Sequence, residues 1–162
     1  MTKVLNKLRQ FTNAIVILFF ALVVIVVSIQ VFARFVLGTS IRWADEFSRF
    51  AFVWVIYLGG AITIRDGRNV CFDLILEAQK GFVWKIMYTA VFLLSSLFLV
   101  LITYFGILVC MSLMSETSPI MQLPMSVVSL CIPIGGVLML IEEISLYVMH
   151  KDDRTKSGQE EQ

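Results

Sequence analysis

Residues 41–68 read IRWADEFSRFAFVWVIYLGGAITIRDGR. The run begins in charged residues, continues through mostly apolar residues, and ends in charged residues again. About twenty predominantly apolar residues are what a helix needs to cross the hydrocarbon core of a bilayer. The stretch therefore predicts a transmembrane helix over about residues 44–64, with a charged group at its start.

Four charged residues stand at the start of this span. Arg42 lies three and four positions before Asp45 and Glu46, and Arg49 lies four and three positions after them. At these spacings, side chains on a helix can meet on adjacent turns. We expect them to form an ion-pair network; the alternative for Arg42, Asp45 and Glu46 is a position in headgroup water.

Arg49 lies about one turn deeper than this acidic pair, roughly 6 Å along the helix. A lone Arg at the centre of a span costs about 3 kcal/mol on insertion scales. We therefore expect Arg49 to pair locally with an acid or to contact another helix or a partner protein.

Aromatic and small residues continue along the same span. The aromatic residues that we place on one face are Trp43, Phe47, Phe50 and Trp54. This face extends well below the headgroups, which favours helix packing over an interfacial belt. Gly59 and Gly60 follow, and they predict close approach of a neighbouring backbone.

The composition places the whole chain in a membrane. Of its 162 residues, 59% are hydrophobic and 15% are charged, which is too apolar for a soluble domain. We predict an all-α integral membrane protein with four transmembrane helices and interfacial amphipathic helices. The three cysteines, Cys71, Cys110 and Cys131, have no C-x-x-C spacing and are interpreted as packing residues.

Apolar runs predict a four-span membrane domain over residues 1–150. The four spans are expected at about residues 11–37, 44–64, 83–114 and 124–141. Residues 1–10 form a basic amphipathic lead-in on the membrane surface. Residues 70–82 predict a further interfacial helix, with a soluble loop as the alternative. Residues 151–162 are expected to be a disordered cytoplasmic tail.

The first span has an alternative interpretation as a secretory signal, since Val31, Phe32 and Ala33 resemble a cleavage site. We favour a retained anchor, because the apolar run is too long for a typical signal. The last span contains Pro133, which permits a kink, followed by Gly135 and Gly136.

Glu142 and Glu143 mark the inner boundary of the last span. Acids inside a membrane are often proton or ion sites. However, the run before them is already at the short end of a sufficient span, so we expect both to be interfacial. In the third span, Ser95 and Ser96 suit helix contact.

Basic residues predict the orientation. Ten of the thirteen lie at the termini and in the middle loop, whereas the opposite loops contain only Arg34 and Arg42. The ten are Lys3, Lys7, Arg9, Arg65, Arg68, Lys80, Lys85, Lys151, Arg154 and Lys156. The positive-inside rule then places both termini in the cytoplasm, and it places the charged start of the second span outside.

Catalytic chemistry is not predicted. The only histidine is His150 in the tail, so haem between helices would lack this ligand type. We expect no enzyme activity, no cofactor, no metal site and no nucleic-acid partner. Two other classes are considered: a self-contained transporter that oligomerises around Glu142 or Asp45, and, less favoured, an anchor in a respiratory or assembly complex.

Residues 30–70, QVFARFVLGTSIRWADEFSRFAFVWVIYLGGAITIRDGRNV, resemble the small membrane subunit, the Q or DctQ-type subunit, of tripartite ATP-independent periplasmic (TRAP) transporters. The matching residues are Arg34, Trp43, Asp45, Glu46, Arg49, Trp54, Gly59 and Arg65, followed later by Ser118-Pro119 and Leu123-Pro124. The resemblance covers essentially the whole chain. It departs at Asn69, where many relatives have a histidine.

The resemblance implies a non-catalytic subunit of a sodium-coupled transporter in the bacterial inner membrane. A periplasmic binding protein would deliver an organic acid, such as sialic acid, a dicarboxylate or a sugar acid, to a large multi-span subunit. This chain would brace that subunit and help dock the binding protein. Because the chain ends at Gln162, we expect the large subunit to be a separate chain.

The expected contact residues follow from this interpretation. They would form a subunit interface or a periplasmic ion-pair network, with lipid around the remaining surface. The candidates are Arg34, Arg42, Trp43, Asp45, Glu46, Arg49, Phe50, Trp54, Gly59 and Gly60. Trp43, Phe50 and Trp54 are expected to pack against the large subunit or the first span.

Overall fold

The computed structural model describes residues 2–39, 41–66 and 82–160. Its helices are α1 (Thr2–Val36), α2 (Arg42–Arg65), α4 (Phe82–Ser112), α5 (Met125–Ser129) and α6 (Cys131–Glu160). Four helical segments are long and apolar enough to cross a membrane, and α5 and α6 together supply the last of them. The predicted all-α fold with four spans is confirmed. The predicted interfacial helix lies outside the described residues, except for Phe82, which begins α4.

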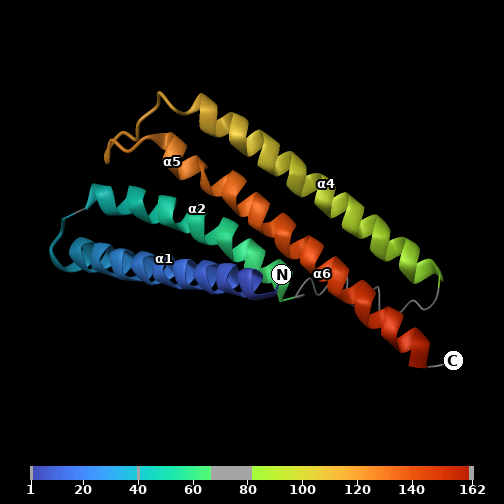
Figure 1. Cartoon of the computed structure of the whole chain (residues 1–162). Helices are drawn as coiled ribbons and strands as arrows, with labels where there is room; N and C mark the ends of the chain where they lie inside the picture. The colour runs from blue at the N-terminus through green and yellow to red at the C-terminus, as the bar shows by residue number, and fades with distance from the viewer. Residues whose placement is uncertain (1, 40, 67–81, 161–162) are drawn as a thin grey trace.

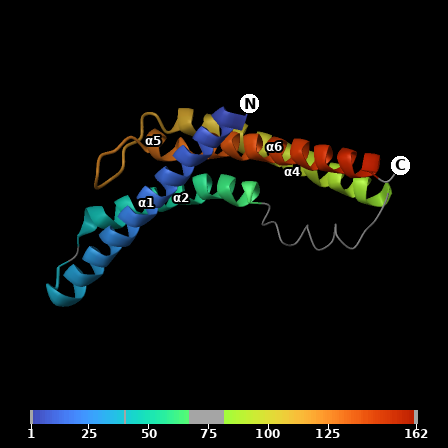
Figure 2. The ribbon, with the colours of Figure 1, turned by 60° about the horizontal axis from the view of Figure 1, so that its bottom comes forward.

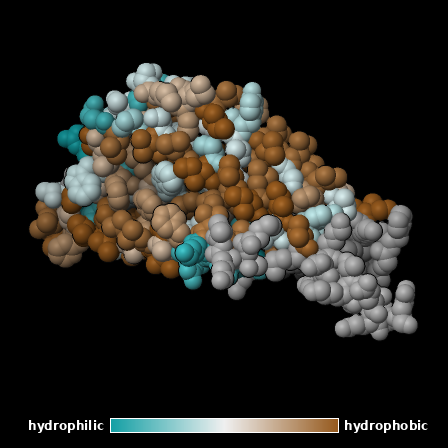
Figure 3. All heavy atoms as spheres, viewed as in Figure 1, coloured by the Kyte–Doolittle hydropathy of each residue, from teal (hydrophilic) through white to brown (hydrophobic). Residues whose placement is uncertain are grey.

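The four long helices lie in a row whose order differs from their order in the sequence. α1 packs against α2, α2 against α6, and α6 against α4 (Figure 1). The last helix is thus inserted between the second and the third. In the turned view, α1 crosses α2 obliquely (Figure 2). Apolar side chains cover most of the face drawn in Figure 3, as expected for a surface in contact with lipid.

Small side chains on α2 allow its neighbours to approach closely. The buried residues of this helix are Ala44, Ala51, Leu58 and Ala61. The first three are seven residues apart, so they lie on one face of the helix. Three of the four are alanines, which suits close contact between helices in a membrane.

The glycine pair of α6 makes close contacts with both neighbouring helices. A Cβ atom added to Gly135 would lie 3.0 Å from the carbonyl oxygen of Tyr57 on α2. A Cβ atom added to Gly136 would overlap the hydroxyl of Thr103 on α4. The absence of side chains at these two positions therefore allows α6 to pack against α2 and α4 at the same time.

The glycine pair of α2 has different surroundings. Gly60 faces the flexible end of the Met139 side chain on α6, and no heavy atom lies within 4 Å of a Cβ atom built on Gly59. Close approach of another helix at these two positions stays a prediction, and within this chain such an approach is present at Gly135.

The last span is interrupted at Leu130, between α5 and α6. Pro133 follows in the first turn of α6. Because proline has no backbone N–H, the carbonyl of Ser129 lacks its usual helical donor. The interruption therefore lies close to the proline, in the region where the sequence permits a kink.

Two segments at the chain ends extend the neighbouring helices. Residues 2–10, the predicted amphipathic lead-in, are the first turns of α1. Residues 151–160, for which a disordered tail was predicted, continue α6. In both cases the segment extends an existing helix, and extension is far less costly than nucleation.

Candidate functional site

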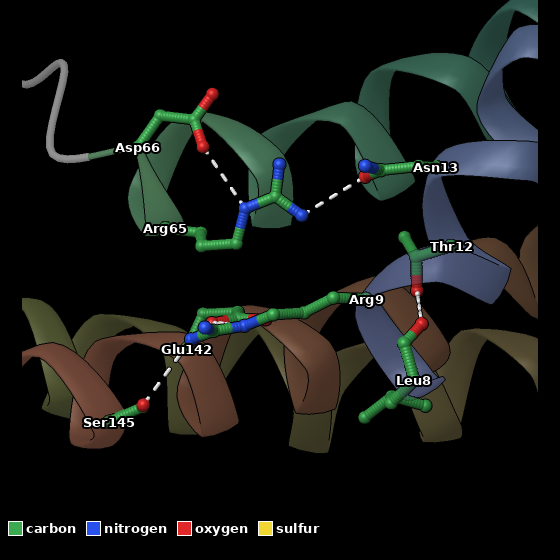
Figure 4. A network of polar contacts seen from close by, with 8 residues as sticks. All are labelled: Leu8, Arg9, Thr12, Asn13, Arg65, Asp66, Glu142 and Ser145. Atoms are coloured by element: carbon green, nitrogen blue, oxygen red, sulfur yellow. Dashed lines mark hydrogen bonds and ion pairs between the residues drawn. The ribbon is translucent and has the colours of Figure 1, made fainter. Parts of the chain in front are cut away.

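A multidentate ion pair joins the first and last helices. The Arg9 side chain binds the Glu142 carboxylate with Nη2 2.5 Å from Oε2 and with Nε 2.9 Å from Oε1. Arg9 Nη2 also donates to the Ser145 hydroxyl at 3.3 Å (Figure 4). Glu142 is only 6% exposed. This multidentate pair ties α1 to α6, although the backbones of these two helices are not neighbours.

A second arginine lies beside this pair and ties α2 to α1. Arg65, in the last turn of α2, donates from Nη1 to Asn13 Oδ1 at 3.0 Å and from Nε to Asp66 Oδ1 at 3.0 Å. Figure 4 shows the two arginines beside one another, each bound to an acid. We name Arg9, Asn13, Arg65, Asp66, Glu142 and Ser145 the Arg9 cluster. Its two formal positive charges equal its two formal negative charges.

A small cavity adjoins the Arg9 cluster. It has a volume of about 10 Å³ and is lined by Leu8, Arg9, Thr12, Ala61, Ile62, Arg65, Leu138 and Glu142. A space of this size accommodates about one water molecule, which is far too small for an organic acid. In the described part of the chain, no group of three or more His, Cys, Asp and Glu side chains is arranged to hold a metal ion.

The next residue, Glu143, faces the other neighbour of α6. Its carboxylate accepts hydrogen bonds from the hydroxyl of Ser95 and, at 3.3 Å, from that of Ser96 on α4. One helical turn further on, the Tyr147 ring stacks on Phe92 with 4.1 Å between centroids. Adjacent carboxylates on α6 therefore bind different helices: Glu142 binds α1, and Glu143 binds α4.

The sequence predicted an interfacial position for both acids, and it predicted no partner for Glu142. The side chain is buried because α1 is continuous and presents Arg9 to it. The sequence contained a usable signal. With four spans, the start of the first and the end of the last lie on the same side of the membrane, so opposite charges there can meet.

The predicted charged group at the start of α2 only partly assembles. Arg49 Nη2 lies 3.0 Å from Asp45 Oδ2, and these side chains are 77% and 57% exposed. Glu46 instead accepts the backbone N–H of Met121 at 2.8 Å. Asp45 and Glu46 are adjacent in the sequence, so their side chains point about 100° apart around the helix. For this reason the described residues do not form the expected four-residue network.

Glu46 attaches a folded loop to α2. Met121 belongs to the segment between α4 and α5, which an isolated antiparallel bridge between Thr117 and Pro124 closes. Within it, the Ser118 N–H donates to the Leu123 carbonyl at 2.9 Å. The two-proline segment of the sequence is therefore an ordered loop held against the start of α2.

The remaining candidates divide between the interior and the surface. Trp54 stacks on Phe19 of α1, with 6.0 Å between ring centroids and an interplanar angle of 7°. Phe50 is half-buried, whereas Trp43 is 52% exposed and Arg34 is also exposed. Trp54 therefore packs on the first span, one of the two contacts predicted for it.

Comparison with known proteins gives a family. Residues 23–149 match the family described as tripartite ATP-independent periplasmic transporters, DctQ component. The C4-dicarboxylate TRAP transporter small permease protein DctQ of Rhodobacter capsulatus is 33% identical over 107 residues. That alignment covers 63% of this chain and 46% of the relative, so the chain spans less than half the length of that protein. Because the family match extends over most of the chain and includes both α6 glutamates, this protein belongs to the DctQ family of TRAP transporter components.

Proposed function

We propose that the chain is the non-catalytic small membrane subunit of a sodium-coupled TRAP transporter in a bacterial inner membrane. It would brace a separate large transport subunit during uptake of an organic acid. Family membership supports the transport role. The name of the Rhodobacter relative makes C4-dicarboxylates the first substrates to test, before sialic acid and sugar acids.

The observation that carries this proposal is that buried and half-buried charged side chains are bound by side chains of other helices. Glu142 binds Arg9, and Glu143 accepts from two serine hydroxyls. Arg65 binds Asn13 and Asp66. A subunit that braces a moving neighbour needs its own helices fixed to one another, and these contacts connect every helix of the row.

The same observation disfavours a self-contained transporter. That alternative needs Glu142 or Asp45 as the ion or substrate site. Glu142 is already bound by a guanidinium, and the adjoining cavity has room for about one water molecule. Asp45 is exposed and paired with Arg49 on its own helix.

The distribution of basic residues supports an orientation of the chain in the membrane, and that orientation supports a role in docking the binding protein. With both termini in the cytoplasm, the Arg49–Asp45 pair and the loop held by Glu46 lie at the periplasmic surface. Exposed Arg34 and Arg42 add positive charge there. We include in the proposal that this end helps to dock the periplasmic binding protein.

Reconstitution tests the function. The chain is co-expressed with the large TRAP membrane subunit from its own operon, purified, and placed in liposomes with the corresponding binding protein. Uptake of labelled C4-dicarboxylate is then driven by a sodium gradient. We expect uptake only when all three proteins are present. Transport by this chain alone, abolished by Glu142→Gln, would establish the alternative instead.

A further inference from the structure

The cavity beside the Arg9 cluster lies between three helices. α1, α2 and α6 each contribute at least one polar and one apolar side chain to its lining. Its volume of about 10 Å³ is at the lower end of the space that one water molecule needs. Cavities with an apolar lining stay dry, whereas a polar cavity with two to four hydrogen-bonding partners can hold a water molecule. The chemistry of the lining therefore decides what the cavity contains.

Both arginines that line the cavity have N–H donors to spare. Arg9 uses Nε and Nη2 for its contacts in the Arg9 cluster, and Arg65 uses Nε and Nη1. Among the described residues, no acceptor binds Arg9 Nη1 or Arg65 Nη2. The two side chains are only 20% and 19% exposed. Because a shielded N–H group without an acceptor costs free energy, these donors favour a small acceptor in the cavity.

Acceptors for the same small molecule line the cavity as well. The two oxygens of a carboxylate offer about four acceptor sites, and Arg9 occupies at most three of them on Glu142. The Thr12 hydroxyl donates its hydrogen to the Leu8 carbonyl at 3.0 Å, so its oxygen can only accept a further hydrogen bond. A water molecule both accepts from N–H groups and donates to oxygens, and it therefore complements this lining in both directions.

The charges around the cavity select a neutral occupant. A metal cation would lie beside the guanidinium groups of Arg9 and Arg65, and a chloride ion would lie beside the Glu142 carboxylate. The Arg9 cluster carries equal numbers of formal positive and negative charges. A small neutral molecule with both donors and acceptors avoids either repulsion.

We propose that the cavity holds one water molecule, bound by the N–H groups of Arg9 and Arg65 and by the oxygens of Glu142 and Thr12. The direct hydrogen bonds form two separate sets: Arg9 ties α1 to α6, and Arg65 ties α2 to α1 (Figure 4). The water joins the two sets, so that three helices meet at one hydrogen-bonded site. This inference goes beyond the proposed function, because it concerns the chain alone.

Radiolytic labelling tests the occupant directly. A short X-ray pulse converts water to hydroxyl radicals, and a radical formed from a buried water oxidises the side chains beside it. The full chain is irradiated in lipid nanodiscs, and the oxygen added to each residue is measured by mass spectrometry. Because a buried water lies beside it, Leu138 of the cavity lining should be labelled at least about fivefold faster than Leu140.

Leu140 is the matched control for this comparison. Like Leu138, it is half-buried on α6, but it does not line the cavity. It also lies nearer to the Val148 end of the span, so radicals that enter from bulk water at that end would label Leu140 first. Equal labelling of the two leucines would show that the cavity is dry and would overturn the proposal.

Filling the cavity gives a second readout. Ala61 lines the cavity and is buried, and Ala61→Val places methyl groups in the space of the water. Labelling of Leu138 should then fall to the level of Leu140. The control is Ala51→Val, because Ala51 is equally buried on α2 but does not line the cavity. This control should keep the labelling of Leu138 within about twofold of wild type.

Persistent labelling of Leu138 in a folded Ala61→Val variant would overturn the proposal, because the radicals would then come from elsewhere. If Ala61→Val does not fold, the comparison of Leu138 with Leu140 in the wild-type chain decides the outcome.

Discussion

The protein contains two arginine–carboxylate pairs with opposite characters. Arg9 and Glu142 are 133 positions apart in the sequence, and their side chains are 20% and 8% exposed. Arg49 and Asp45 are four positions apart, and their side chains are 77% and 57% exposed. The first pair ties two helices together, whereas the second lies on one helix and faces outward. The pair that stabilises the chain itself is therefore the buried one that joins two helices, although the exposed pair is easier to find in the sequence.

The largest expected effect comes from removing one partner of the buried pair. Arg9→Leu leaves Glu142 buried without its cation, and breaking a buried pair in this way costs about 3–5 kcal/mol. The free energy of unfolding, measured for the isolated chain in mixed detergent micelles, should fall by that amount.

A matched double variant separates charge from packing. Adding Glu142→Leu to Arg9→Leu removes the unpaired charge and should recover most of the loss, because apolar residues can replace a buried ion pair. If Arg9→Leu alone left the free energy of unfolding unchanged, the distinction between the two pairs would be contradicted.

The next largest effect tests the glycine contact that holds α6 against α2. Gly135→Ala places a methyl group against the Tyr57 backbone, and overpacking of this kind costs about 1–3 kcal/mol. Gly60→Ala meets only the movable end of Met139, so its loss should be smaller. The same unfolding measurement checks both, and a reversed order would contradict the packing described for α6.

A smaller effect is expected at the other side of α6. Ser95→Ala removes one donor from the half-buried Glu143, and a fully buried acceptor left unsatisfied costs about 1–3 kcal/mol. We expect the lower part of that range, because Ser96 still donates. Ser112→Ala is the control, since its exposed hydroxyl only bonds the carbonyl of Leu108 on its own helix. Equal stability of the two variants would show that Glu143 does not hold α4.

The smallest effect is expected at the exposed pair. Asp45→Asn should change the unfolding free energy of the isolated chain by at most about 0.5 kcal/mol, as for other exposed pairs on one helix. A loss above about 2 kcal/mol, well outside the range of exposed pairs, would show that this pair also stabilises the fold.

Local features of the structure could be predicted from the sequence. Apolar length is sufficient to find four spans, and a spacing of four residues is sufficient to pair Arg49 with Asp45. Pro133 marks the region where the last span is interrupted. Each of these depends on the geometry of a single helix.

Contacts between helices could not be predicted in the same way. Lipid is as apolar as the helix surfaces, so hydrophobicity does not choose neighbours in a membrane. The insertion of α6 between α2 and α4 depends on glycines of α6 that meet Tyr57 of α2 and Thr103 of α4. For the same reason, the sequence did not show that Glu142 meets Arg9 or that Glu143 faces the serines of α4.

The most direct test measures two quantities on the same two variants. For Arg9→Leu and Arg49→Leu, we would determine the unfolding free energy of the isolated chain and the yield of co-purified large subunit. We predict that Arg9→Leu lowers the unfolding free energy by about 3–5 kcal/mol. Arg49→Leu should lower the yield of large subunit while the stability of the isolated chain stays within about 0.5 kcal/mol of wild type. Loss of stability in Arg49→Leu as large as in Arg9→Leu, or full recovery of the large subunit with Arg49→Leu, would contradict this division of roles.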